Sequence, residues 1–187
     1  MSRLASVQDF EQGGLYFPPY QRFPFFGTRA DTLRGRFQTV KILIAGCGWG
    51  YTVDELVQRG ADAWGVDASS YAIDRSVVPA RTRLGDCSVK ADMDAIRTVA
   101  GLRGNKFFDV IVTEDLLTCC ESEAEVQTMM TTLRASGTLL VHILSVTDGT
   151  PRDLADYCAP GLLWRTPDQW RTIVGGDLLL DPMGRVI

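Results

Sequence analysis

The sequence predicts a doubly wound α/β fold with a mostly parallel sheet, preceded by an irregular, aromatic N-terminal arm. Three observations predict it. From residue 40 onward, apolar segments of strand length alternate with segments of helical periodicity. Several strand segments are apolar on both faces, as in a parallel sheet that helices cover on either side. A glycine-rich turn joins the first strand to the helix that follows it.

The predicted strands are short apolar runs bounded by turn residues. They span residues 40–45, 61–66, 82–85, 107–113 and 138–144. Two last strands, at 177–180 and 185–187, are expected on either side of a turn at 181–184. The strands at 107–113 and 138–144 have the continuous apolar character of the centre of a sheet.

The predicted helices alternate with these strands. They span residues 28–37, 51–59, about 69–77, 90–102, 122–134 and 166–174. Ser122 and Thr166 are residues that cap a helix N-terminus, and Pro167 stands at the first helical position, where proline is tolerated. Gly60 ends the helix at 51–59.

The chain of 187 residues is expected to form one globular unit, with an arm and short helix at 1–38 and the α/β domain at 39–187. The arm is rich in aromatic residues and interrupted by prolines. Its aromatic residues are Phe10, Tyr16, Phe17, Tyr20, Phe23, Phe25 and Phe26. We interpret this arm as an ordered segment and a candidate lid over a substrate site.

Composition favours a protein of the cytoplasm. No apolar run approaches the roughly 20 residues of a membrane span, and residues 1–15 contain no signal-peptide core. The five cysteines include no C-x-x-C pair and suit a reducing compartment. With a single histidine, His142, the sequence predicts no zinc site. We expect His142 to be a hydrogen-bonded core residue.

The net charge of −4 does not favour general affinity for nucleic acid, but basic residues gather near the N-terminus. Segment 22–41 holds five basic residues against one acid. Its arginines are Arg22, Arg29, Arg34 and Arg36. They can hold an anionic group of a substrate, or they can be solvated side chains on a short helix.

The glycine turn reads GCGWG at 46–50, and acidic residues follow the next two strands. Such a turn lets backbone approach a ligand closely, at a helix start that offers free N–H groups. Asp67 follows Gly46 by 21 residues, the spacing of an acid that accepts ribose hydroxyls. Asp86, after the third strand, is placed to accept from an adenine amino group. A nucleoside site at the carboxyl ends of the strands is therefore predicted.

The pattern does not fit a dinucleotide site, because G-x-G-x-x-G requires a third glycine where Tyr51 stands. The ordered set ILIAGCGWG at 42–50, GVDAS at 65–69, GDC at 85–87 and FDVIVTEDLL at 108–117 resembles the class I S-adenosylmethionine-dependent methyltransferases, which have a Rossmann-like fold. The resemblance covers about residues 40–144. It implies a methyltransferase with S-adenosylmethionine as cofactor and S-adenosylhomocysteine as product.

The resemblance also implies site residues. The turn around the methionine part of the cofactor would be formed by Gly46, Cys47, Gly48, Trp49 and Gly50. Asp67 would bind the ribose with Ala68 beside the adenine, and Asp86 and the Cys87 backbone would contact the adenine ring. Thr113 and Glu114 would line the methyl-transfer site. Glu114 and Asp115 are the candidate general bases, the alternative being a solvated loop pair.

One position departs from the family pattern. Such families carry an acid two residues before the first glycine, where this chain has Ile44. Another carboxylate such as Glu114 can substitute for it. The departure also favours an alternative class, a methyltransferase-like binding or scaffold protein without catalysis.

The stretch YFPPY at 16–20 resembles the tail of the recognition loop of DNA amino-methyltransferases. In that loop the residue before the prolines accepts hydrogen bonds from the target amino group, and here it is Phe17, which accepts none. The loop should also follow the fourth strand. We therefore expect a small-molecule acceptor first, and a protein or nucleic-acid acceptor met through the basic arm second.

Overall fold

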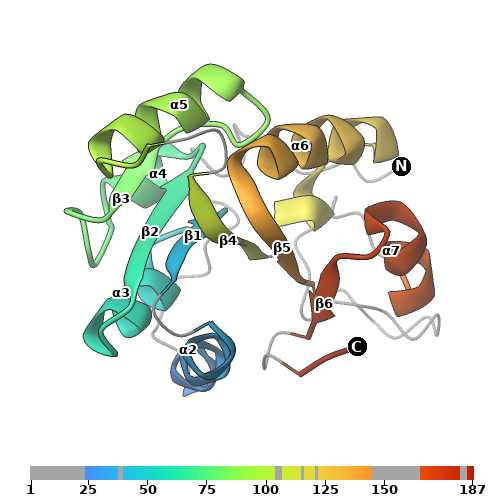
Figure 1. Cartoon of the computed structure of the whole chain (residues 1–187), viewed down its shortest axis with the longest axis horizontal. Helices are drawn as coiled ribbons and strands as arrows, with labels where there is room; N and C mark the ends of the chain where they lie inside the picture. The colour runs from blue at the N-terminus through green and yellow to red at the C-terminus, as the bar shows by residue number, and fades with distance from the viewer. Residues whose placement is uncertain are drawn as a thin grey trace.

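The computed structural model describes residues 24–37, 40–103, 107–114, 116–120, 122–144, 165–181 and 185–187, with side chains from Ala30 onward. One parallel sheet runs through the molecule, and helices cover both of its faces (Figure 1). The strands are β1 Lys41–Ala45, β2 Asp62–Asp67, β3 Thr82–Leu84, β4 Phe108–Glu114, β5 Gly137–Ile143 and β6 Leu178–Leu180. The predicted doubly wound α/β fold is confirmed.

The helices are α2 Pro24–Arg36, α3 Tyr51–Gln58, α4 Ser70–Ile73, α5 Lys90–Val99, α6 Glu123–Ser136 and α7 Pro167–Val174, with a 3-10 turn η1 at Leu116–Cys119. Ser122 and Thr166 accept backbone N–H bonds at the starts of α6 and α7, as their sequence positions predict. At α7 the cap is reciprocal, because the Gln169 side chain accepts from the Thr166 N–H at 2.8 Å.

The strand order is β3-β2-β1-β4-β5-β6, and each of these neighbouring pairs is parallel. This is the order of the Rossmann fold, with its reversal point between β1 and β4. Ala45, the last residue of β1, pairs with Val66 of β2 on one side and Thr113 of β4 on the other. The ends of these three strands therefore lie level with one another at one edge of the sheet.

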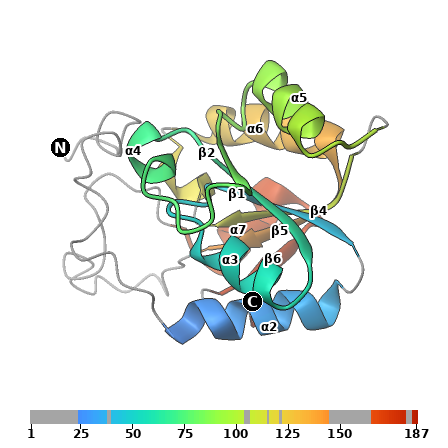
Figure 2. The ribbon, with the colours of Figure 1, turned by 90° about the vertical axis from the view of Figure 1, so that its left-hand side faces the viewer.

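Helices α5 and α6 lie on one side of the sheet and α2 on the other (Figure 2). Two apolar layers pack the helices against the sheet. On one face, Ile44 and Val112 pack with Leu33 of α2 and Leu56 of α3. Residues of the opposite parity, such as Ile111, face the other layer. That layer includes Met93 of α5, Met130 of α6 and Trp170 of α7. Because successive side chains of a strand point to opposite faces of the sheet, the position of each residue at a strand end determines which of the two layers it faces.

The structure departs from the predicted elements at several places. Helix α5 ends at Val99 rather than residue 102, and no predicted element covers η1. Helix α2 begins at Pro24 rather than residue 28, because proline is compatible with the first helical turn. Helix α4 ends at Ile73 rather than near 77, and the predicted last strand at 185–187 is a single antiparallel bridge between Leu180 and Val186. The aromatic segment before residue 24, including YFPPY, lies outside the described residues.

Gly137 is the first residue of β5, at a position where the Ile111 side chain leaves no room for a Cβ. A Cβ at this position would lie 2.6 Å from Cγ1 and 2.7 Å from Cδ1 of the buried Ile111. We expect Gly137→Ala to lower the free energy of unfolding by about 1–3 kcal/mol, the usual range for overpacking a core. Urea denaturation followed by circular dichroism measures it.

The matched control is Gly35→Ala in α2, where an added Cβ meets nothing within 4 Å. This change should leave stability unchanged or raise it by up to about 1 kcal/mol, because alanine is the better helix former. Equal unfolding midpoints for both variants would contradict the predicted close packing at β5.

Candidate active site

The glycine turn between β1 and α3 adopts backbone conformations that favour glycine. Gly46, Gly48 and Gly50 have φ values of 75°, 53° and 79°, in the left-handed region. A Cβ on Gly46 would also lie 3.0 Å from the Cβ of Leu116, and one on Gly50 would lie 3.0 Å from Cγ2 of Thr82. The turn therefore presents bare backbone at the reversal point of the sheet.

Asp67 fastens this turn to the end of β2. Its Oδ2 accepts a hydrogen bond from the Gly48 N–H at 2.8 Å, and its Oδ1 accepts one from the Ser69 N–H at 2.9 Å. The N–H groups of Gly46 and Cys47 both donate to the Val66 carbonyl, at 2.9 and 3.0 Å. A carboxylate offers about four lone-pair sites, so it can hold backbone amides and ligand hydroxyls together.

Asp86 lies beside Asp67 at the end of β3. The Gly85 N–H donates to the Asp67 carbonyl at 3.0 Å, which joins the two strand ends. The Asp86 Oδ1 accepts two hydrogen bonds from Ser88, from its N–H and its hydroxyl, both at 2.7 Å. Asp86 is half-buried, so its carboxylate is reachable from the same edge as Asp67.

The cysteines of this edge are buried thiols. Burial, followed by the negative charges of Asp67 and Asp86, holds the pKa of Cys87 well above its usual range. Burial and Asp67 raise the pKa of Cys47 in the same way. Burial likewise raises the pKa of Cys120, beyond η1, to about 12. These thiols are protonated at neutral pH, so any contact they make with a ligand is a neutral one.

Glu114 closes the edge at the end of β4. Its Oε1 accepts a hydrogen bond from the Thr52 hydroxyl in the first turn of α3, at 2.5 Å. By strand parity Glu114 shares a sheet face with Val112, and Val112 pairs with the fully buried Ile44 of β1. Its half-buried carboxylate therefore lies near the glycine turn, on the face where Ile44 replaces the expected acid.

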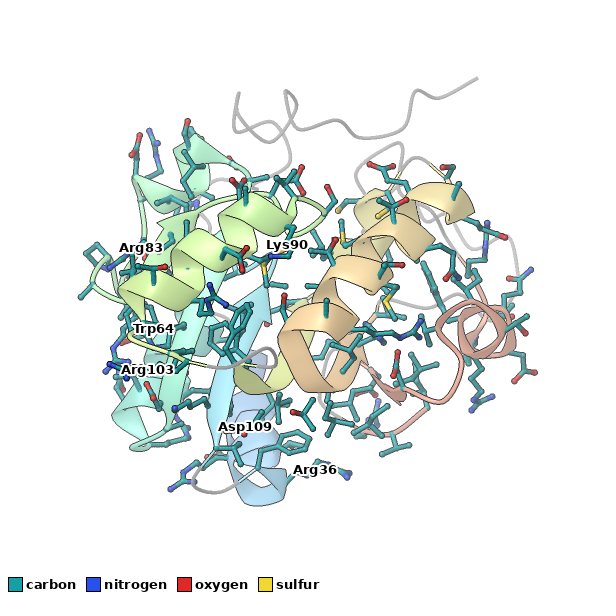
Figure 3. All side chains as sticks on the ribbon, turned by 45° about the horizontal axis from the view of Figure 1, so that its top comes forward. Arg36, Trp64, Arg83, Lys90, Arg103 and Asp109 are labelled. Carbon is teal, nitrogen blue, oxygen red and sulfur yellow. The ribbon has the colours of Figure 1, made fainter. Side chains whose placement is uncertain are left out.

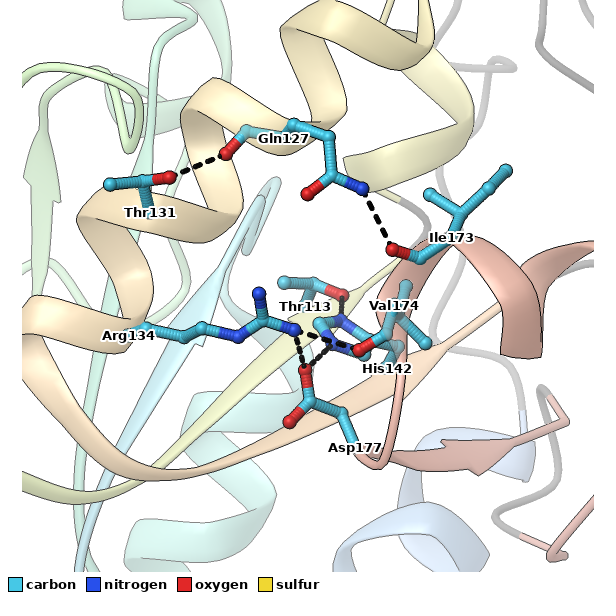
Figure 4. A network of polar contacts seen from close by, with 8 residues as sticks. All are labelled: Thr113, Gln127, Thr131, Arg134, His142, Ile173, Val174 and Asp177. Carbon is cyan, nitrogen blue, oxygen red and sulfur yellow. Dashed lines mark hydrogen bonds and ion pairs between the residues drawn. The ribbon is translucent and has the colours of Figure 1, made fainter.

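Thr113 points to the opposite face of β4 (Figure 4). Its side chain is fully buried, and its Oγ1 lies 2.8 Å from Nδ1 of His142 on β5. Nε2 of His142 lies 3.4 Å from Oδ2 of Asp177, which accepts a hydrogen bond from Arg134 of α6 at 2.9 Å. The Thr113 hydroxyl is thus committed to a buried polar network.

The remaining predicted site residues fall partly outside this edge. Trp49 and Ala68 lie in the turns after β1 and β2, beside the residues above, and Asp115 lies outside the described residues. Arg34 donates from Nε to the Arg59 carbonyl at the C-terminus of α3, at 3.2 Å. Because α3 runs back from the glycine turn, that carbonyl lies at the opposite edge of the sheet.

Arg36 lies at that opposite edge as well. Figure 3 shows it at the same end of the molecule as Asp109, which follows the first residue of β4. The Asp109 carboxylate accepts from the N–H of Lys41 at the start of β1, at 2.8 Å. Arg22 and the side chain of Arg29 lie outside the described residues.

Sequence reasoning missed the partners that hold the site residues. Thr52, Asp177 and Arg134 belong to no sequence motif. Thr52 and Glu114 are 62 residues apart, His142 and Asp177 are 35 apart, and Arg134 and Asp177 are 43 apart. Only the sheet register and the packing of α3 and α6 bring them together. The capping position of Ser69 was the one local signal, and its hydroxyl accepts from the Ala72 N–H.

The edge as a whole combines bare glycine backbone, the N-terminus of α3 and three carboxylates from three different strands. Helix N-termini favour anionic groups, and carboxylates accept from hydroxyl and amino groups. Such an edge can hold a nucleoside with an attached amino acid. This edge agrees with the resemblance to the class I S-adenosylmethionine-dependent methyltransferases seen in the sequence.

Comparisons with known proteins identify the family. The family model described as a methyltransferase domain matches residues 43–141, more than half of the chain. This chain belongs to that methyltransferase family. A curated relative, the ubiquinone biosynthesis O-methyltransferase of Sinorhizobium medicae (strain WSM419), is 28% identical over 188 residues, covering 97% of this chain and 68% of the relative.

Solved structures with the same fold include several methyltransferases. The magnesium protoporphyrin IX methyltransferase ChlM of Synechocystis PCC 6803 with bound S-adenosylhomocysteine has a TM-score of 0.58 at 18% identity, covering 91% of this chain and 83% of ChlM. A SAM-dependent methyltransferase of Archaeoglobus fulgidus has a TM-score of 0.58 at 14% identity, covering 78% and 65%. The CcbJ methyltransferase of Streptomyces caelestis is longer, and the chain spans 49% of it.

Among the described residues, no helix is long and apolar enough to cross a membrane.

The buried imidazole of His142 should make stability depend on pH. Burial lowers the pKa of His142, and the nearby Asp177 offsets only part of that effect. The unfolded chain binds a proton near pH 6.5 that the folded protein does not, so stability falls as pH falls below that value. We expect a loss of up to about 1.4 kcal/mol per pH unit below 6.5.

Urea unfolding at pH 7.5, 6.5 and 5.5 measures this slope. The control is His142→Gln, which keeps a polar side chain without a titrating ring and should show a flatter slope, whatever its absolute stability. Asp177 does not interfere over this pH range. Its burial raises its pKa, but the hydrogen bonds and charges of His142 and Arg134 together hold that pKa below the usual range. Equal slopes for both proteins would contradict a neutral buried His142.

Proposed function

We propose that this class I S-adenosylmethionine-dependent methyltransferase transfers its methyl group to an oxygen atom of a small molecule. The observation that carries the proposal is the convergence of the glycine turn, Asp67, Asp86 and Glu114 at one edge of the sheet. The O-methyltransferase named among the relatives aligns along 97% of this chain and supports oxygen as the acceptor atom.

Each part of the edge has a proposed contact with the cofactor. The turn of Gly46, Cys47, Gly48, Trp49 and Gly50 surrounds the methionine part. Asp67 accepts from the ribose hydroxyls with Ala68 beside the adenine, and Asp86 accepts from the adenine amino group. The Cys87 backbone contacts the adenine ring. Of Thr113 only the backbone can line the site, because its side chain is buried in the network with His142. The observed roles of Asp67 in the turn support this assignment, because its carboxylate already faces the glycine backbone.

S-adenosylmethionine, when bound, supplies a methyl group carried on a positively charged sulfur. The acceptor oxygen would bond to the methyl carbon from the side opposite the sulfur, and the carbon–sulfur bond would break to leave S-adenosylhomocysteine. The chain's own task is to orient the acceptor and exclude water. A hydroxyl acceptor releases a proton, and the carboxylate of Glu114 is the described group best placed to take it. Asp115 is the second candidate for this role.

Glu114 has a further proposed role, as the carboxylate that replaces the acid missing at Ile44. Ile44 is fully buried and apolar, so it offers nothing to the cofactor's amino group. Glu114 lies on the same sheet face, at the end of the neighbouring strand, and is held by Thr52. A charge-assisted hydrogen bond from the amino group to Glu114 fits this placement.

An alternative is a methyltransferase-like binding protein that holds the cofactor without catalysis, and Ile44 is the residue that favours it. A protein or nucleic-acid acceptor is the third candidate. Of its proposed arginines, Arg34 and Arg36 lie at the far edge, so Arg22 and Arg29 remain the candidates for an anionic group. We also propose a cytoplasmic location, since Cys47, Cys87 and Cys120 are free, buried thiols that suit a reducing compartment.

The division into an arm with a short helix at 1–38 and a methyltransferase domain at 39–187 stays a prediction. Helix α2 of the proposed arm segment contributes the buried Ala30 and Leu33 to the core beside α3. This packing supports one globular unit that includes both segments.

The cofactor site can be tested by calorimetric titration with S-adenosylmethionine and S-adenosylhomocysteine. We expect binding by the unchanged protein and a roughly 10- to 100-fold loss of affinity in Asp67→Ala, since hydrogen bonds to a charged group contribute about 1.5–3 kcal/mol each. The control is Asp62→Ala at the start of the same strand, where the exposed side chain pairs with Arg81. No binding of either compound would remove the proposed cofactor.

The two roles of Glu114 predict different outcomes for Glu114→Gln. A partner for the amino group would weaken binding of S-adenosylmethionine roughly tenfold or more. A general base would leave binding intact and slow methyl transfer. Calorimetry and single-turnover rates, once an acceptor is identified, separate the two. Glu123→Gln, an exposed carboxylate paired with Arg165, is the control and should change neither.

A further inference from the structure

We propose that His142 is a positioning residue for the methyl-transfer site, acting through Thr113 to hold the end of β4 and with it Glu114. The inference rests on the proposed role of Glu114 toward the cofactor. It starts from an observation that the cofactor site leaves unexplained, the buried network of Thr113, His142, Asp177 and Arg134 (Figure 4).

The hydrogen bonds of this network have one consistent direction. Asp177 is held ionised by His142 and Arg134 against the effect of its own burial, so its carboxylate can only accept. The neutral imidazole then carries its proton on Nε2, which faces Oδ2 of Asp177. Nδ1 is left as the acceptor, and the Thr113 hydroxyl donates to it. A single tautomer of His142 therefore fixes the rotamer of Thr113.

The anchored rotamer fixes the strand end because Thr113 and Glu114 are consecutive. Thr113 pairs with His142 in the β4–β5 register, so the two side chains are direct cross-strand neighbours. On the opposite face, Glu114 is bound by Thr52. The last two residues of β4 are thus held from both sides of the sheet, by β5 on one face and α3 on the other.

The network also joins β4 to the C-terminal part of the chain. Arg134 of α6 donates from Nη2 both to Asp177 and to the Val174 carbonyl at the end of α7, at 2.7 Å. Asp177 precedes β6, which is the edge strand beside β5. A movement of the segment from α7 to β6 would therefore move Asp177, which contacts His142, and His142 in turn contacts Thr113 at the methyl-transfer edge.

The experiment compares two ligands that share the nucleoside. S-adenosylhomocysteine carries the amino acid that Glu114 is proposed to hold, and 5′-methylthioadenosine lacks it. We expect Thr113→Val and His142→Gln to weaken S-adenosylhomocysteine binding about tenfold while 5′-methylthioadenosine binding stays within about twofold. General damage to the fold would weaken both ligands alike and would overturn the inference.

Two further variants sharpen the comparison. Thr113→Ser keeps the hydroxyl and should restore the affinity for S-adenosylhomocysteine. Gln127→Ala removes a different α6–α7 hydrogen bond, from the Gln127 side chain to the Ile173 carbonyl, and should change neither ligand's affinity. If Gln127→Ala reproduces the loss, the effect belongs to the α6–α7 interface and not to His142.

The single histidine gives an independent readout. Because His142 is the only imidazole in the chain, ¹⁵N labelling of histidine yields one ring whose nitrogen shifts report its tautomer. We expect a neutral ring protonated at Nε2 whose Nδ1 signal moves when S-adenosylhomocysteine is added. If the ligand binds but the signal and both variant affinities stay unchanged, the inference fails and the proposed function stands. If the ligand does not bind, the proposed function itself fails.

Discussion

The carboxylate of Asp67 is the constraint on which the edge of the sheet depends. It binds the Gly48 amide on one side and the Ser69 amide on the other, so it joins the turn after β1 to the turn after β2. Hydrogen bonds to a charged acceptor are the strong ones, about 1.5–3 kcal/mol each. A glycine turn is otherwise a costly segment to order, because glycine loses the most backbone freedom on folding. Asp67 offsets that loss before any ligand arrives.

This arrangement explains which parts of the site the sequence could predict. Glycine conformations and the acids that follow strands are local features, so the turn, Asp67 and Asp86 could be located from the printed residues alone. The Thr52–Glu114 and His142–Asp177 contacts depend on register and helix packing, which no local pattern encodes. The start of α2 at Pro24 differs from the prediction for a local reason, because proline interrupts an irregular segment and also fits the first turn of a helix.

The burial of Ile44 gives a physical reason for the proposed role of Glu114 as the replacing acid. A carboxylate at residue 44 would sit within the central strand, under α3 and α2, where Ile44 is fully buried. Burying a charge without a partner is expensive. Glu114 lies on the same face but at the strand end, half-buried and bonded to Thr52. An apolar β1 with a carboxylate at the end of β4 keeps a charge out of the core and places a carboxylate at the proposed cofactor edge.

The boundary of the family match adds a last step to this picture. The matched segment, residues 43–141, contains the glycine turn, Asp67, Asp86 and Glu114, and it ends one residue before His142. Asp177, which orients His142, lies further beyond it. The proposed cofactor contacts therefore come from the segment that the family model describes, whereas the partners that hold Thr113 come from the C-terminal part of the chain. If the end of β4 must be rigid for methyl transfer, Thr52 supplies part of that rigidity within the matched segment and His142 supplies the rest from outside it. The α7–β6 part of the chain is then the place where a relative with the same glycine turn could set a different geometry for its acceptor.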